Sequence, residues 1–179
     1  MTARHQRPAA RRRTERLEHL RELARRLPAI GGEVGPDIAA VWPHRLLDPR
    51  RPAGPDGVSG LYMATVYGLR TDGCGAVACL AGLTVLDCPA EAARTRARLA
   101  AERNLPPTGV DVLDVAAHIL GLDPATRDAL FCGVGSRWGE NLGTIPKQAV
   151  LSALDRVIAG HRGTAIWSGS SSTTRRSET

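Results

Sequence analysis

The chain has 179 residues, of which 42% are hydrophobic, and a formal net charge of +6. This length and composition predict a single globular domain with its own core, and they exclude a wholly disordered chain. The charge lies at one end, because residues 1–30 hold nine arginines against three glutamates while the remaining residues balance.

The N-terminal part of the chain combines an arginine-rich arm with a first helix. Residues 1–13 are predicted to be a disordered arm, followed by a single helical domain over 14–162. Leucines at intervals of three and four residues predict a helix over 14–27, and a weaker helix is expected over 37–42. Residues 61–69 alternate only loosely, so a short strand or hairpin and a helix both remain open there.

The rest of the domain is predicted to be helical, with helices separated by long loops. Apolar periodicity and caps such as Asp123-Pro124 predict five further helices, over 75–86, 90–102, 110–120, 124–131 and 145–158, the last capped by Thr144. The serine- and threonine-rich tail over 163–179 is predicted to be disordered. The expected fold is therefore mainly α, a compact bundle of about five or six helices.

Three sequence blocks carry a resemblance to known proteins. They are Cys-Gly-Ala-Val-Ala-Cys-Leu-Ala-Gly over 74–82, Leu-Gly-Leu leading to Ala-Leu-Phe over 120–131, and Thr-Ile-Pro over 144–146. Together they resemble small uncharacterised proteins of actinobacteria, proteobacteria and their phages, which share a Cys-Gly-Thr-x-x-Cys-x-Ala-Gly-type motif. Ala76 and Leu83 depart from the threonine and the aromatic residue common there. The resemblance implies a helical fold and a phage or mobile-element origin, without a known activity.

The first of these blocks admits a structural and a catalytic interpretation. In the structural one, the small residues Gly75, Ala78 and Gly82 lie on one helix that a neighbouring backbone approaches closely, and Cys79 is a buried hydrophobe. In the catalytic one, Cys74 stands at a helix start that lowers the pKa of its thiol, and His118 serves as its base. The structural interpretation is preferred, because no further sequence signature accompanies this pair.

No metal site or cofactor is predicted. The four cysteines lack the close spacing of a structural zinc site, and they suit free thiols in the cytoplasm. Asp111, Asp114 and His118 fall on one face of their helix and are interpreted as a solvated face, with Asp114 and His118 forming an i, i+4 pair. The chain shows neither a signal peptide nor a run long enough to span a membrane.

Two basic surfaces are predicted to contact a partner. Arg11, Arg12, Arg13 and Arg16 could neutralise phosphates, so nucleic acid is a possible partner for residues 4–26. Arg137 and Trp138 lie in a glycine-rich loop that is suited to a protein contact.

The function expected from the sequence is that of a non-enzymatic binding or regulatory protein acting through a macromolecular partner, with a protein as the favoured partner. A cysteine-dependent hydrolase or transferase using Cys74 and His118 is one alternative. A nucleic-acid-binding protein using the arginine-rich N-terminus is the other.

Overall fold

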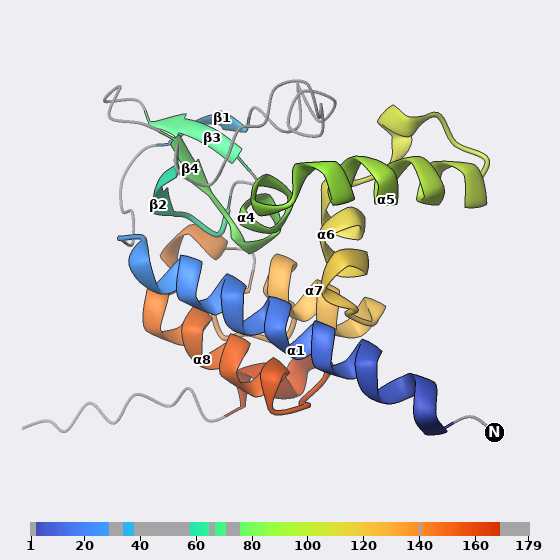
Figure 1. Ribbon diagram of the computed structural model, residues 1–179. Helices are drawn as coiled ribbons and strands as arrows, with labels where there is room; N and C mark the ends of the chain where they lie inside the picture. Colours follow the sequence, from blue (N-terminus) through green and yellow to red (C-terminus); the bar gives the residue numbers. More distant parts are fainter. Residues whose placement is uncertain are drawn as a thin grey trace, which may run out of the picture.

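A computed structural model describes residues 3–28, 34–37, 58–64, 67–70, 76–139 and 141–168. The mainly α prediction is confirmed, because six α-helices dominate these residues (Figure 1). The α-helices are α1 (Ala3–Arg26), α4 (Leu80–Asp87), α5 (Pro89–Glu102), α6 (Val112–Leu120), α7 (Pro124–Cys132) and α8 (Lys147–Ile158). Short 3-10 helices occur at η2 (Pro107–Gly109), η3 (Leu142–Thr144) and η4 (Gly163–Trp167). Among the described residues, no helix has the length and hydrophobicity needed to cross a bilayer.

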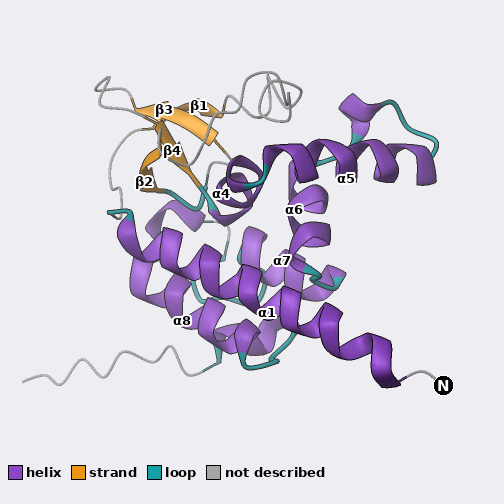
Figure 2. Ribbon diagram, viewed as in Figure 1, coloured by secondary structure: helices purple, strands orange, loops and turns teal. Residues whose placement is uncertain are grey.

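A small sheet lies at one end of the helices (Figure 2). Its strands are β1 (Val34–Asp37), β2 (Val58–Leu61), β3 (Tyr67–Arg70) and β4 (Ala76–Ala78), in the order β1-β3-β4-β2. β3 pairs antiparallel with both β1 and β4, whereas β2 pairs parallel with β4. Residues 61–69, for which a strand and a helix were both open, therefore carry strands at both ends: β2 ends at Leu61 and β3 begins at Tyr67.

Helix α4 is the centre of the core. Every residue from Leu80 to Leu86 is buried, which fits a short helix that is apolar on all sides. It packs against α6, α1 and α5, while α1 runs alongside α8 (Figure 1). The N-terminal end of α1 extends beyond the outline of the bundle in the same view.

The prediction of one helix over 75–86 is wrong in its first part. Ala76–Ala78 is strand β4, and the helix begins at Leu80 after Cys79 as its N-cap. Leu61 of β2 and Tyr67 of β3 both pair with Ala78, so the strand is held by two neighbouring strands that come earlier in the chain. Small apolar residues suit a strand and a helix alike, and the pairing decides between them.

Both predicted disordered ends are partly ordered. α1 begins at Ala3 instead of Thr14, so the arm over 1–13 is helical from Ala3 onward; its alanines and arginines are good helix formers. The tail over 163–179 begins with η4, in which Ile166 and Trp167 are buried. The serine-rich composition behind that prediction starts only after Trp167. The helix expected over 37–42 lies outside the described residues except for Asp37, which ends β1.

The helix ends test the predicted caps. Asp123 caps α7 by accepting a hydrogen bond from the Thr126 amide at 2.9 Å, as predicted. Thr144 does not cap α8, which starts at Lys147; its hydroxyl donates to the Asn141 carbonyl at 2.9 Å. Ile145 precedes Pro146, and a residue before proline is disfavoured in the helical region, so the helix starts later.

Candidate binding cleft between α1, α5 and α6

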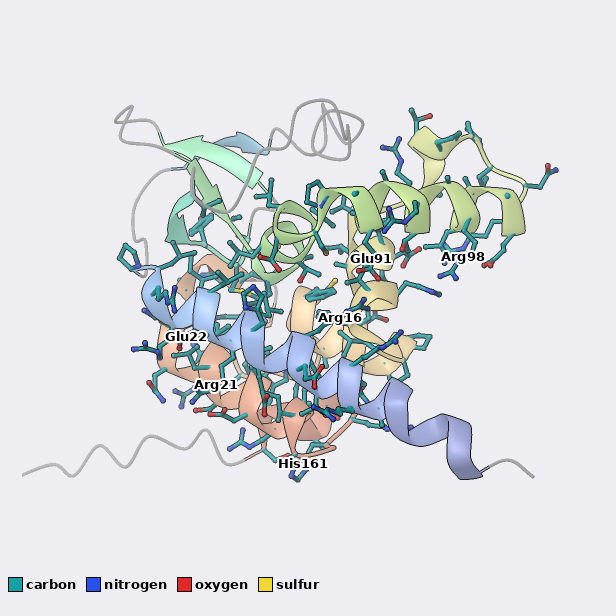
Figure 3. All side chains as sticks on the ribbon, viewed as in Figure 1. Arg16, Arg21, Glu22, Glu91, Arg98 and His161 are labelled. Atoms are coloured by element: carbon teal, nitrogen blue, oxygen red, sulfur yellow. The ribbon has the colours of Figure 1, made fainter. Side chains whose placement is uncertain are left out.

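The second half of α1 is fastened to the bundle by arginines. Nη2 of Arg16 lies 2.6 and 2.8 Å from the two carboxylate oxygens of Glu91 on α5. Nη1 of Arg16 donates to the Ile119 carbonyl on α6 at 2.6 Å. In Figure 3, Arg16 and Glu91 lie between α1 and α5. Arg21 pairs with Asp155 on α8, and the hydrogen bond and charge of Asp155 raise the pKa of Arg21. Arg16 and Arg21 therefore form ion pairs that hold α1 against α5 and α8.

Arg25 and Arg26 share one acidic partner within α1, the carboxylate of Glu22. The Nε atoms of Arg25 and Arg26 lie 2.7 and 2.9 Å from the carboxylate oxygens of Glu22. Hydrogen bonds from Arg25 and Arg26 lower the pKa of Glu22 to about 2. Glu22 therefore offsets part of the positive charge at this end of the helix.

The first half of α1 is different, because residues 1–14 contain five arginines and no acidic residue. Arg11 forms an exposed pair with Glu15 at 2.8 Å, and exposed pairs of this kind contribute little. Arg12 is exposed and forms no ion pair within the described part of the chain. Arg13 packs on α6, with its Cδ 3.4 Å from where a Cβ on Gly121 would lie. Of the arginines at this end whose side chains the structure describes, Arg12 and Arg13 thus have no acidic partner and Arg11 has only an exposed one.

Two neighbouring cavities lie between α1 and the α4–α6 region, and the Arg16–Glu91 pair lines both. The smaller, of about 260 Å³, has an apolar floor and a charged rim. Its floor includes Leu20, Leu23, Ile119 and Leu120, and its rim includes Arg12, Glu15, His19 and Asp87. His19 Nε2 lies 3.0 Å from Asp87 Oδ1 across this rim.

The larger cavity has a volume of about 410 Å³ and a basic lining. Besides Arg16 and Glu91 it is lined by Arg94, Thr95 and Arg98 of α5 and by His118 of α6. Arg98 contacts the His118 ring through its Nη2. Neither Arg94 nor Arg98 is among the site residues predicted from the sequence. Their spacing of four residues on a helix was the available signal, but spacing alone does not show that α6 and α1 close the space around them.

Arg137 and Trp138 lie apart from these cavities. The Trp138 ring stands edge-on to Trp167, with centroids 5.8 Å apart and planes at 66°. The Arg137 guanidinium lies 4.6 Å from the centroid of the Trp138 ring. Trp138 is half-buried in this stack, so its contact with Trp167 holds η4 against the bundle.

The structure removes the helix argument for a catalytic cysteine. Cys74 and Gly75 lie outside the described residues, and the helix that was to activate Cys74 begins only at Leu80. His118 is exposed on α6 beside Arg98. The stripe of small residues also fails as a single helical face, because Ala78 is in β4 and only Gly82 is in α4. Ala78, Cys79 and Gly82 are nevertheless all buried.

Cys88 is expected to react slowly with iodoacetamide. Burial, followed by the charges of Glu91 and Asp87, raises the pKa of Cys88 to about 11, and its Sγ donates to the Thr84 carbonyl at 3.0 Å. At about pH 8 only about one thiol in a thousand is then ionised, and reactivity rises with pH up to about 11. Peptide mass spectrometry should show alkylation at least tenfold slower in the native protein than in denaturing urea. Equal rates would contradict this prediction.

Asp111 and Asp114 both face arginines, and only Asp111 is exposed to solvent. The interpretation as a solvated face is therefore wrong for Asp114. Arg127 of α7 lies between them, with Nε 3.0 Å from Asp114 Oδ1 and Nη2 3.4 Å from Asp111 Oδ2. Arg103 also pairs with Asp114, while His118 turns to Arg98 instead of forming the expected pair with Asp114. Within the described segments, no three His, Cys, Asp or Glu side chains gather as metal ligands would.

Comparison of the chain with protein-family models, with curated proteins and with solved structures finds no match. The resemblance to the phage and actinobacterial proteins therefore stays a prediction.

Proposed function

We propose that this protein is a non-enzymatic binding protein, that it acts in the cytoplasm, and that its partner is a nucleic acid held by the first half of α1. The observation that carries the proposal is the division of the α1 arginines. Arg16 and Arg21 have acidic partners on other helices, and Arg25 and Arg26 share Glu22. Of Arg11, Arg12 and Arg13, only Arg11 has an acidic partner among the described residues, the exposed Glu15.

The projecting end of α1 suits a phosphate backbone. Arginine binds phosphate through paired N–H groups, and each phosphate neutralised releases counterions, so the binding depends steeply on salt. Positions 4, 7 and 11 recur at helical intervals, which favours a basic edge along this end. A protein partner is the less favoured choice, because Trp138, the aromatic residue of the predicted protein contact, packs on Trp167.

The enzymatic alternative has less support. It needs an activated thiol, and of the described cysteines Cys88 and Cys132 both have a pKa raised chiefly by burial. Cys79 has an exposed fraction of only 2%.

The test compares two pairs of arginines on the same helix. Fluorescence anisotropy with a labelled single-stranded RNA and a labelled DNA duplex, at several salt concentrations, gives the affinity and its salt dependence. We expect Arg11→Ala with Arg12→Ala to weaken binding at least tenfold and to reduce the slope of log K against log salt by about 2. Arg25→Ala with Arg26→Ala removes the same charge and should leave that slope within about 0.5 of the parent.

Arg13 is left unchanged in this test because it packs on Gly121. Equal losses of affinity in the two double variants would mean that binding depends only on net charge. That result would contradict a site at the end of α1. Absence of binding to both nucleic acids would overturn the proposal, and equally tight binding of polyglutamate would favour an acidic protein partner instead.

A further inference from the structure

We propose that the larger cavity between α1, α5 and α6 binds a phosphate group, carried either by a small phosphate ester or by a nucleic acid. This site uses Arg94 and Arg98, which have no part in the proposed contact at the end of α1. The phosphate site can therefore be tested separately from the proposed function.

The balance of charge around the cavity is the first argument. Among the residues that the structure describes, three arginines line the cavity and Glu91 is its one acidic residue, so without His118 this lining carries a formal charge of +2. Both oxygens of Glu91 are engaged by Arg16. The remaining positive charge belongs to α5 and lacks a close acidic partner within the cavity.

Arg94 and Arg98 are the groups left to bind an anion. Arg94 is exposed and has no ion pair among the residues described. Arg98 lies 3.7 Å from Glu102, and both side chains are more than half exposed, so the pair holds its guanidinium weakly. One helical turn separates Arg94 from Arg98, which places both on the same side of α5.

The chemistry of the lining is the second argument. The Arg98 guanidinium meets the His118 ring, so a basic residue from α5 and one from α6 face the same space. The Thr95 hydroxyl, from a residue with an exposed fraction of 7%, adds a neutral donor. Guanidinium groups bind phosphate through charge-assisted, often bidentate hydrogen bonds, so a tetrahedral oxyanion matches this set.

The size of the cavity indicates a ligand larger than a phosphate ion. A volume of about 410 Å³ is in the range of sites for organic ligands. The phosphate group is therefore expected to be part of a larger molecule, with the arginines binding its charged end.

The test uses inorganic phosphate and pyrophosphate as probes of the full-length chain. Isothermal titration calorimetry at constant ionic strength, with chloride as the reference anion, should show pyrophosphate binding to the parent protein. We expect Arg94→Gln with Arg98→Gln to weaken it at least tenfold. Arg137→Gln with Arg162→Gln removes the same charge from exposed positions elsewhere and should leave it within about twofold of the parent.

Thermal melting of each variant verifies folding, and His118→Gln gives a second variant that should weaken binding severalfold. Failure of phosphate and pyrophosphate to bind the parent, or equal losses in the two double variants, would overturn the site. Competition identifies the carrier of the phosphate. If pyrophosphate displaces a labelled oligonucleotide and Arg94→Gln with Arg98→Gln weakens that oligonucleotide, the site holds a nucleic-acid phosphate. If pyrophosphate binds unchanged when nucleic acid is saturating, it holds a small phosphate ester.

Discussion

Replacing Trp167 by alanine is expected to lower the free energy of unfolding by about 3–4 kcal/mol. Trp167 has an exposed fraction of 6%, its ring packs against Trp138, and its Nε1 donates to the Ala129 carbonyl at 3.0 Å. The substitution removes a large apolar surface and leaves that buried carbonyl without its donor. Urea unfolding followed by far-ultraviolet circular dichroism measures the change.

Two further substitutions separate the contributions at this position. Trp167→Phe retains most of the ring packing but not the hydrogen bond, so its loss should be about 1–2 kcal/mol. Val134→Ala, at a side chain with an exposed fraction of 51%, should change the free energy of unfolding by less than about 0.5 kcal/mol. A loss below about 1 kcal/mol for Trp167→Ala would mean that η4 adds little to the core.

Replacing Arg127 by leucine is expected to lower the free energy of unfolding by about 2 kcal/mol. Its Nη1 lies 2.6 Å from Asp128, and its other nitrogens face Asp111 and Asp114. Partial burial lowers the pKa of Arg127, but the hydrogen bond that it donates to Asp128 and the charges of the three aspartates outweigh burial and raise it. Leucine retains much of the aliphatic volume and leaves these carboxylates to repel one another.

A double-mutant cycle tests this explanation. Adding Asp114→Asn to Arg127→Leu removes part of the repulsion, so the double variant should be more stable than the sum of the two single losses predicts. Higher salt should also reduce the loss in Arg127→Leu, because it screens the carboxylates. Arg162→Leu, at a 70% exposed side chain 4.0 Å from Asp123, should cost less than about 0.5 kcal/mol. Strict additivity in the cycle would contradict the explanation.

The candidate site was only partly predictable, and the α1 arginines show why. Their count and position at one end of the chain are visible in the sequence, and so is the absence of acidic residues before Glu15. Their division into paired and unpaired groups is not, because the partners of Arg16 and Arg21 lie 75 and 134 residues away. The larger cavity is hidden for the same reason, since its lining comes from three helices.

The sequence by itself determined the helices whose signals are local. Asp123-Pro124 starts α7, the apolar face and Gly121 define α6 and its end, and α5 follows its alanines and arginines. These features depend on residues a few positions apart, so no distant partner is needed to recognise them. The tertiary structure alone decided that Ala76–Ala78 is a strand, that Trp167 belongs to the core, and that Arg94, Arg98 and His118 meet. In each case the deciding contact joins residues from different elements, and it outweighs a weak local preference.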